Sequence, residues 1–350
     1  MKEISKKDLI FVFGTRPEYQ KLKNLMRICS KNGLKTKAFY IPHKKNVALE
    51  NLLKKEDYSV RIFYKKPGDS LFHFVQNILK NESVSKSIFI VSSDTTVAAS
   101  TAIFTKNFDH ELVKIDAGLR RGDFTLPEDK NSIISDHLAF INFCSSENNK
   151  NNLINESFNE KIYISGSTLI DNEHFEVLNK NLYHNKNGPI IISVHRKETL
   201  QDTKKVWVLL REIAKRNCFA KIIIHCDSYF KIPRSKFIEK IEPLSHKRFL
   251  DTISKSRLII TDSQNLQEET CFLGTPCVTL LEKNNRPETI LCGHTKVLNL
   301  NNSLNNNLLR SKINRVLNDS LNPKKYTFPY KNQEKPGEYI FNIIKDILNK

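Results

Sequence analysis

Short apolar runs alternate with amphipathic segments along the whole chain. Runs such as IIIH and LIIT are apolar up to their last residue, which is typical of central strands that are buried on both faces. Segments with the period of an amphipathic helix separate most of these runs. Strands that alternate with helices indicate βαβ units and parallel sheets, so the pattern predicts an α/β fold.

The strands fall into two series. In the first half we expect strands at Leu9–Phe13, Lys37–Ile41, Val60–Tyr64, Ile88–Ser92, Leu112–Ile115, Ile141–Cys144 and Lys161–Ile164. In the second half we expect them at Pro189–Val194, Lys221–His225, Arg257–Thr261 and Cys277–Leu281. The segment between the series, Asn172–Asn187, is rich in Asn, Lys and His and is typical of a linker.

A chain of 350 residues exceeds the usual size of one hydrophobic core. We therefore predict two Rossmann-like domains, residues 1–171 and 172–350. The last amphipathic helix, 335–349, either closes the second domain or crosses back to the first.

Polar clusters follow six of the expected strands. They are GTRPE (14–18), SSDTT (92–96), DAGLRR (116–121), HRKE (195–198), HCD (225–227) and DSQN (262–265). Ligands of open α/β sheets bind beyond the carboxyl ends of the strands. Three such clusters in each half predict one ligand site in a cleft between facing domains.

In the first half the candidates are two cations and three acids. Arg16 and Lys21 suit phosphate or sugar oxygens, although Arg16 could instead pair with Glu18 at a helix start. Asp94 is either a helix N-cap or a catalytic carboxylate.

Asp116 and Glu128 lie in a loop that Gly118 and Pro127 constrain. They are either surface acids that pair with neighbouring arginines or carboxylates for acid–base chemistry.

In the second half, His195 closes an apolar strand and is either a site residue or a satisfied core histidine. Ser263 begins a helix, where backbone N–H groups favour a phosphate, although a capping box would use the same residue. Glu269, one turn further, is placed to bind ribose hydroxyls, and Arg286 could meet the same phosphates.

Net charge indicates which ligands the protein could bind, and cysteine content indicates its redox compartment. Lys and Arg number 56 against 38 acids, a net charge of +18, which favours anionic ligands. The basic residues are spread along the chain without an aromatic repeat, so nucleic acid is not expected. Seven cysteines without CxxC spacing indicate buried free thiols in a reducing compartment.

The first apolar run is too short for a signal peptide, and no stretch has the length of a membrane span. We therefore expect a cytoplasmic protein. The sequence lacks GxGxxG, P-loop, HExxH and GxSxG motifs, which disfavours a nicotinamide enzyme, a P-loop kinase and a zinc enzyme.

Several motifs occur together in one order: GTRPE, SDTT, DAGLR, SDHLA, GSTLID, HRKE, CFLGTPC and RPET. In this order the chain resembles the non-hydrolysing UDP-N-acetylglucosamine 2-epimerases, over roughly residues 8–345. The resemblance implies the glycosyltransferase-B architecture, a cytoplasmic homodimer, and no metal or nicotinamide cofactor. It also implies inversion at C2 of the sugar through elimination and re-addition of UDP, in the synthesis of surface-glycan precursors.

The resemblance also implies roles for individual residues. Asp94, Asp116 and Glu128 would be the acid–base carboxylates, and His195 would help UDP to leave. The residues that would bind UDP or sugar are Arg16, Lys21, Arg120, His225, Phe249, Ser263, Gln264, Asn265, Glu269 and Arg286.

Two departures from the family pattern keep alternatives open. Asp116 stands where the family usually has glutamate, and Gln264 and Asn265 stand where it has two glycines. One alternative is a glycosyltransferase or an inactive sugar-nucleotide-binding relative. Another is a hydrolysing epimerase, although Thr95 and the AGLR motif resemble the non-hydrolysing branch.

Overall fold

The chain forms two compact units in the computed structural model. The first contains residues 1–172 and 330–350, and the second contains residues 173–329. The structure describes residues 8–82, 86–158, 161–171, 187–194, 196, 199, 203–216, 218–224, 235–281, 283–284, 286–300, 306–323, 325–330 and 335–348. The expected linker therefore lies outside the described residues, apart from Asn187.

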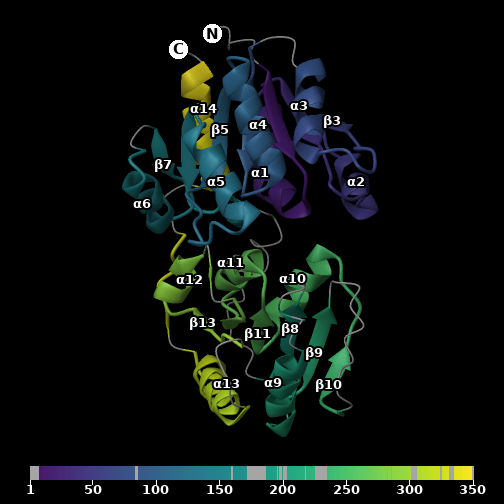
Figure 1. Ribbon diagram of the computed structural model, residues 1–350, viewed down its shortest axis with the longest axis vertical. Coiled ribbons are helices and arrows are strands. Elements are labelled where there is room, and N and C mark those ends of the chain that lie inside the picture. The colour runs from purple at the N-terminus through teal and green to yellow at the C-terminus, as the bar shows by residue number, and fades with distance from the viewer. Residues whose placement is uncertain are drawn as a thin grey trace. The chain divides into compact units, whose positions relative to one another are not determined.

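The first unit is built on a parallel sheet of seven strands in the order β3-β2-β1-β4-β5-β6-β7 (Figure 1). The strands are β1 (Leu9–Phe13), β2 (Thr36–Tyr40), β3 (Ser59–Ile62), β4 (Ile88–Ser92), β5 (Glu111–Ala117), β6 (Ile141–Cys144) and β7 (Ile162–Ile164). All seven expected strands of the first half are confirmed, and β1, β4 and β6 have the predicted bounds. The β1, β4 and β6 runs are buried throughout, because helices cover both faces of the sheet.

The helices of the first unit pack on opposite faces of this sheet. They are α1 (Arg16–Lys31), α2 (Val47–Leu53), α3 (Leu71–Glu82), α4 (Thr96–Asn107), α5 (Pro127–His137), α6 (Glu147–Asn155), the 3-10 helix η1 (Thr168–Asp171) and α14 (Pro336–Leu348). Leu9 and Phe11 of β1 point into a core with α1 and α14. Ile10 and Val12, which alternate with them in sequence, point into a second core with α3 and α4. Successive side chains of the strand point to opposite faces of the sheet, so β1 contributes to the core on each face.

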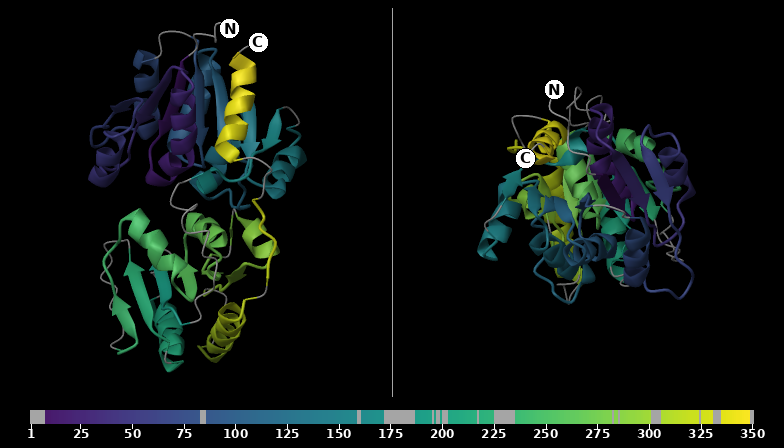
Figure 2. Two further views of the ribbon diagram at one scale, coloured as in Figure 1. Left: turned by 180° about the vertical axis from the view of Figure 1, so that it is seen from behind. Right: turned by 90° about the horizontal axis from the view of Figure 1, so that it is seen from above.

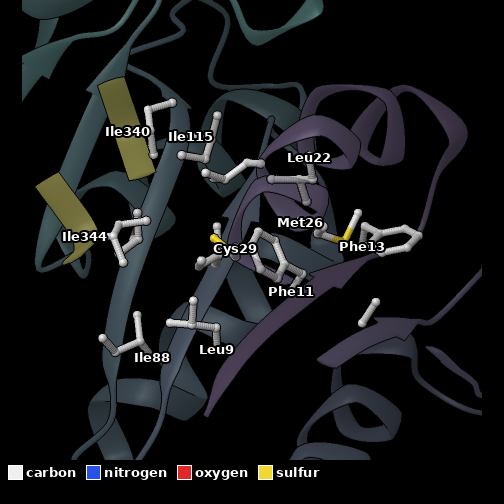
Figure 3. Close-up of a cluster of buried hydrophobic side chains, with 14 of the residues drawn as sticks. Leu9, Phe11, Phe13, Leu22, Met26, Cys29, Ile88, Ile115, Ile340 and Ile344 are labelled. Carbon is white, nitrogen blue, oxygen red and sulfur yellow. The ribbon is translucent and has the colours of Figure 1, made fainter. Parts of the chain in front are cut away.

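The last helix belongs to the first unit, although it follows the whole second unit in sequence. Figure 2 shows α14 along the face of the sheet that is hidden in Figure 1. In Figure 3 its Ile340 and Ile344 point into the cluster that contains Cys29 of α1 and Ile115 of β5. The first turn of α14 contacts η1, because the Gly337 N–H donates to the Asp171 carboxylate at 2.5 Å. The sequence allowed this helix to close the second domain or to cross back to the first. Its apolar face packs in the first unit, so the helix crosses back.

Asp171 makes the first unit sensitive to pH. Burial raises the pKa of its carboxyl from 3.8 to about 6. The favourable contribution of its protonated form is fully present below pH 3.8 and is lost as pH rises through 6. We expect Asp171→Asn to be more stable than the wild type at pH 8 by up to about 3 kcal/mol. Denaturant melts that follow the first unit at pH 4 and pH 8 measure this difference.

The matched control is Asp346→Asn, because Asp346 lies on the same helix but is exposed. This variant should follow the wild type at both pH values. A gain for Asp171→Asn that is equal at pH 4 and pH 8 would contradict ionisation of Asp171 as its cause.

The second unit repeats this plan with a parallel sheet in the order β10-β9-β8-β11-β12-β13. Its strands are β8 (Ile190–Val194), β9 (Ala220–Ile224), β10 (Ile238–Lys240), β11 (Leu258–Thr261), β12 (Cys277–Thr279) and β13 (Thr295–Val297). The four predicted strands are confirmed, while the short edge strands β10 and β13 were not predicted. Both edge strands contain lysine, which is common at sheet edges and breaks the apolar pattern.

Helices also cover the second sheet. They are α9 (Thr203–Lys215), α10 (His246–Ser254), α11 (Gln264–Leu273), α12 (Pro287–Leu291) and α13 (Asn306–Leu321). The main core lies between the sheet and the pair α9 and α13, with Ile192, Leu210 and Ile313 fully buried. The predicted α/β class, with two Rossmann-like sheets, is confirmed.

Six cysteines fall within the described residues, and all six are free thiols, four of them buried. Among the described helices, none is both long and apolar enough to cross a membrane.

Candidate active site

The turn after β1 holds a fully buried glutamate. The Glu18 carboxylate accepts hydrogen bonds from the Gly14 N–H at 3.1 Å and from the Thr15 and Thr95 hydroxyls at 2.7 Å each. Burial raises the pKa of Glu18. A Cβ at Gly14 would lie 2.8 Å from the carbonyl oxygen of Ile41, so the close approach requires glycine. Hydroxyls and an amide thus hold this carboxylate at the first strand end.

Asp94 lies directly after β4 and does not cap the following helix. Thr95 is the N-cap of α4, and its hydroxyl accepts from the Ala98 N–H at 3.2 Å. The Asp94 carboxylate instead accepts from Arg121 Nη2 at 3.0 Å. The preceding residue, Ser93, has a left-handed backbone with φ of 64°. This turn directs Asp94 away from the helix-capping position, and so removes the N-cap alternative.

Asp116 lies at a bulge in β5. The register with β6 shifts between Ile115 and Ala117, and Asp116 itself has φ of 60°. Aspartate adopts this left-handed conformation more readily than most residues. Its carboxylate forms a buried ion pair with Lys21 of α1. A bulge re-aims one side chain out of the strand alternation, so the backbone places Asp116 at the end of β5.

Glu128 belongs to the first turn of α5, and Arg121 connects it to Asp94. Arg121 Nη1 lies 3.9 Å from the Glu128 carboxylate, and the arginine side chain is 5% exposed while the glutamate is 40% exposed. The buried Asp129 carboxylate accepts from the backbone N–H groups of Arg121 and Asp123, at 3.1 and 2.7 Å. The loop before α5 is therefore held in place by α5 itself, and it carries the arginine between the two acids.

Lys114 of β5 is fully buried and faces both Asp94 and Asp116. The three acids predicted for chemistry are consequently not scattered. Asp94 and Glu128 share Arg121, while Asp94 and Asp116 share the field of Lys114. All of them lie where β4 and β5 end, which is the edge at which α/β sheets bind ligands.

Arg120 and Arg16 lie near this cluster in sequence. The Arg120 guanidinium makes a two-point contact with Glu156 at 2.6 and 2.7 Å and donates to Asp136 at 2.7 Å. These contacts give Arg120 a structural role in joining β5, α5 and α6, and its contact with substrate stays a prediction. Arg16 is the first residue of α1 and is half-buried.

In the second unit, the turn after β11 brings Asp262 and Ser263 together with Arg196. The buried Asp262 carboxylate accepts from the Arg196 N–H at 2.9 Å. Ser263 is the N-cap of α11, and its hydroxyl accepts from the Leu266 N–H at 3.3 Å. Gln264 is buried and Asn265 half-buried at the same helix start. Arg196 of the HRKE motif thus meets the DSQN motif at the ends of the neighbouring strands β8 and β11.

The helix α11 holds two glutamates with different partners. Glu269 pairs with His246 of α10 at 2.8 Å, and Phe249 lies half-buried on that same helix. Glu268 forms a buried ion pair with Arg286 at 3.1 Å. Arg286, 1% exposed, is thereby fixed at the start of α12. The structure brings Ser263, Glu269 and Arg286 onto connected elements of one unit.

Two predicted residues, His195 and His225, lie outside the described residues. Sequence reasoning missed Lys114, Asp136 and His246 as parts of these clusters, whereas pairing of Glu128 with a neighbouring arginine was one of its alternatives, and Arg121 lies 3.9 Å from Glu128. For Lys114 a signal existed, because a lysine in an otherwise apolar strand (ELVKIDA) must find buried acids. The pairing of His246 with Glu269 and that of Arg121 with Asp94 arise only through folding.

Comparisons with known proteins identify the family of this chain. The family model described as UDP-N-acetylglucosamine 2-epimerase matches residues 65–345. A UDP-N-acetylglucosamine 2-epimerase of Methanococcus maripaludis is 30% identical over 316 residues, covering 80% of this chain and 84% of that protein.

Two crystal structures show the same fold. The UDP-GlcNAc 2-epimerase of Methanocaldococcus jannaschii, in complex with UDP-GlcNAc and UDP, superimposes with a TM-score of 0.79 at 23% identity, covering 97% of this chain and 99% of that one. The enzyme of Neisseria meningitidis bound to UDP-GlcNAc gives 0.79 at 21% identity, covering 97% and 100%. The family model spans most of the chain, and both units contribute to the match. The protein therefore belongs to the UDP-N-acetylglucosamine 2-epimerase family.

Proposed function

We propose that this enzyme inverts C2 of UDP-N-acetylglucosamine, or of a closely related UDP-sugar, and releases UDP-N-acetylmannosamine without net hydrolysis. Family membership supports the epimerase activity. The observation that carries the finer proposal is the acid cluster of the first unit, where Arg121 joins Asp94 to Glu128 and Lys21 pairs with Asp116. Epimerisation at a carbon needs a base on one face and an acid on the other, and this cluster supplies several carboxylates.

The proposed reaction has two balanced halves. A carboxylate of the cluster takes the C2 proton, the bond from C1 to the UDP oxygen breaks, and the electron pair of the C–H bond forms the double bond of a 2-acetamidoglucal. UDP then returns to C1 while a second carboxylic acid of the cluster gives a proton to C2 on the opposite face. Asp94, Asp116 and Glu128 are the groups to which we assign these two transfers.

We assign the nucleotide to the second unit. The first N–H groups of α11 can receive a diphosphate, since an anion at a helix N-terminus is favourable. Arg286 would add charge-assisted bonds to the same phosphates, and Glu269 would accept from ribose hydroxyls. His195, His225 and Phe249 complete this assignment as predictions from the family resemblance. Homodimer formation and a use of the product in surface-glycan synthesis belong to the same proposal.

One observation supports a sugar-nucleotide-binding protein without epimerisation as the second candidate. Ser263 uses its hydroxyl to cap α11, and the side chain of Gln264 is buried at the helix start where the family has glycine. Glycine allows closer approach of a ligand to the backbone than glutamine does.

Incubation with UDP-GlcNAc in deuterated water tests the proposal. We expect deuterium at C2 by NMR while the sugar remains attached to UDP. Free N-acetylmannosamine and UDP would instead identify a hydrolysing enzyme. Binding of UDP-GlcNAc without exchange would contradict epimerisation and favour the second candidate.

A further inference from the structure

A lysine lies fully buried beneath the acid cluster of the first unit. Lys114 is 0% exposed in the middle of β5, although lysine is among the residue types that are most rarely buried. A buried cation is tolerated only where polar groups and opposite charges replace its water. Its surroundings therefore show what the fold requires of it.

The Lys114 ammonium donates to the carbonyl oxygen of Ser93. Ser93 is one of the described residues other than glycine that has a left-handed backbone, and Asp94 follows it directly. Non-glycine residues in this conformation persist where the surroundings hold them. The ammonium thus bonds the peptide group from which the Asp94 side chain starts.

Four acids from four elements face this ammonium: Glu18 of α1, Asp94 after β4, Asp116 of β5 and Asp136 of α5. Three of them have a further cation in direct contact, namely Arg121 on Asp94, Lys21 on Asp116 and Arg120 on Asp136. Glu18 differs, because the described donors to its carboxylate are the neutral Gly14 N–H and the Thr15 and Thr95 hydroxyls.

Each of the four facing acids thus has a cation near it, and Arg120 and Arg121 also pair with Glu156 and Glu128. Burial lowers the pKa of Lys114, and the facing acids act in the opposite direction. Lys114 in turn acts to lower the pKa of Glu18. Its removal would take a positive charge away from the site where the proposed proton transfers occur.

We propose that Lys114 is a positioning residue of the active site, which holds the Ser93–Asp94 backbone and supplies a positive charge that the surrounding carboxylates face. The inference rests on the proposed function, since the groups that it positions are those assigned to proton transfer. Lys114 itself is 0% exposed, and its proposed action is through its neighbours.

The test compares Lys114→Met with the wild type in C2 deuterium exchange on UDP-GlcNAc from pH 5 to pH 9. We expect kcat to fall about a hundredfold, because a displaced carboxylate loses its geometry. Loss of the cation raises the pKa of the nearby acids, so the acid limb of the kcat/KM profile should move up by about one pH unit. KM should stay within about threefold, since the nucleotide is assigned to the other unit.

Lys37→Met is the matched control. Lys37 is also a lysine of a parallel strand in the same sheet, but it pairs with Asp8 at the opposite, amino end of the strands. The dependence of kcat/KM on pH for Lys37→Met should coincide with that of the wild type. A Lys114→Met profile that also coincides with the wild type, with kcat within about threefold, would overturn the inference.

The single variant could fail to fold because it leaves Glu18 without the opposing charge. The double variant Glu18→Gln/Lys114→Met removes one charge of each sign and should fold, as judged by circular dichroism and by calorimetric binding of UDP. We expect it to show the same low kcat, whereas a wild-type kcat and pH profile would overturn the inference. A wild-type enzyme that shows no exchange would overturn the proposed function itself, which separates the two failures.

Discussion

Replacing Asp116 with asparagine is expected to slow C2 deuterium exchange at least about a thousandfold, within the range measured for loss of a general base. Asparagine adopts a left-handed backbone as readily as aspartate, so the bulge at φ of 60° should persist. The substitution therefore removes the charge and little else. NMR detection of deuterium at C2 of UDP-GlcNAc measures the effect.

The buried Lys21 provides the control for this variant. Asp116→Asn takes away the carboxylate with which Lys21 is paired, and breaking a buried ion pair costs about 3–5 kcal/mol of stability. The double variant Lys21→Met/Asp116→Asn should regain most of that stability and none of the exchange. Wild-type exchange in a stable double variant would remove Asp116 from the mechanism.

The variant Asp116→Glu should also exchange deuterium at C2 more slowly than the wild type. Asp116→Glu restores the residue type that is usual in the family, but the position is 5% exposed and already in contact with Lys21. An added methylene in a packed site displaces its surroundings, and glutamate is less suited to the left-handed backbone. We expect roughly a ten- to hundredfold loss of exchange. An increase would show that the aspartate is a defect rather than the residue for which the site is built.

The second large effect is expected at Arg286 in the other unit. Arg286→Met should destabilise the second unit by about 3–5 kcal/mol, because Glu268, 0% exposed, then keeps its charge without the arginine. If Arg286 also binds the diphosphate as proposed, UDP affinity should fall by about a hundredfold, the loss of two charge-assisted hydrogen bonds. Denaturant melts and calorimetric titration with UDP measure the two effects separately.

A compensated variant distinguishes these two roles. Glu268→Met/Arg286→Met replaces the ion pair with apolar side chains of similar length, a change that is often neutral for stability. We expect the double variant to be stable and still to bind UDP weakly. Stable protein with wild-type UDP affinity would confine Arg286 to a structural role.

Much of the fold could be predicted because a buried strand appears in the sequence as a short run of mostly apolar residues. β1, β4 and β6 are mostly apolar and buried throughout, and their bounds agree with the prediction. The edge strands β10 and β13 do not form such a run, since they are three residues long and contain charged side chains. The positions of Asp94, Asp116 and Ser263 at strand ends could also be predicted, because connectivity alone sets them.

Other features depend on contacts between distant parts of the chain. Lys21 and Asp116 lie 95 positions apart, and no local pattern relates them. Likewise, Asp171 meets Gly337 over 166 positions, which places α14 in the first unit. Sequence spacing was equally unable to show whether Asp94 or Thr95 caps α4, because both residue types suit that role.

By itself, then, the sequence determined the strands other than the edge strands β10 and β13, their alternation with helices and the family to which the order of motifs points. Those properties follow from hydrophobic period and residue type, which are local. Only the tertiary structure decided the backbone conformation at Ser93 and Asp116 and the pairing of each acid with its cation. Ion pairs and left-handed turns are fixed by side chains that folding brings together, and so they could not be derived from neighbours in the chain.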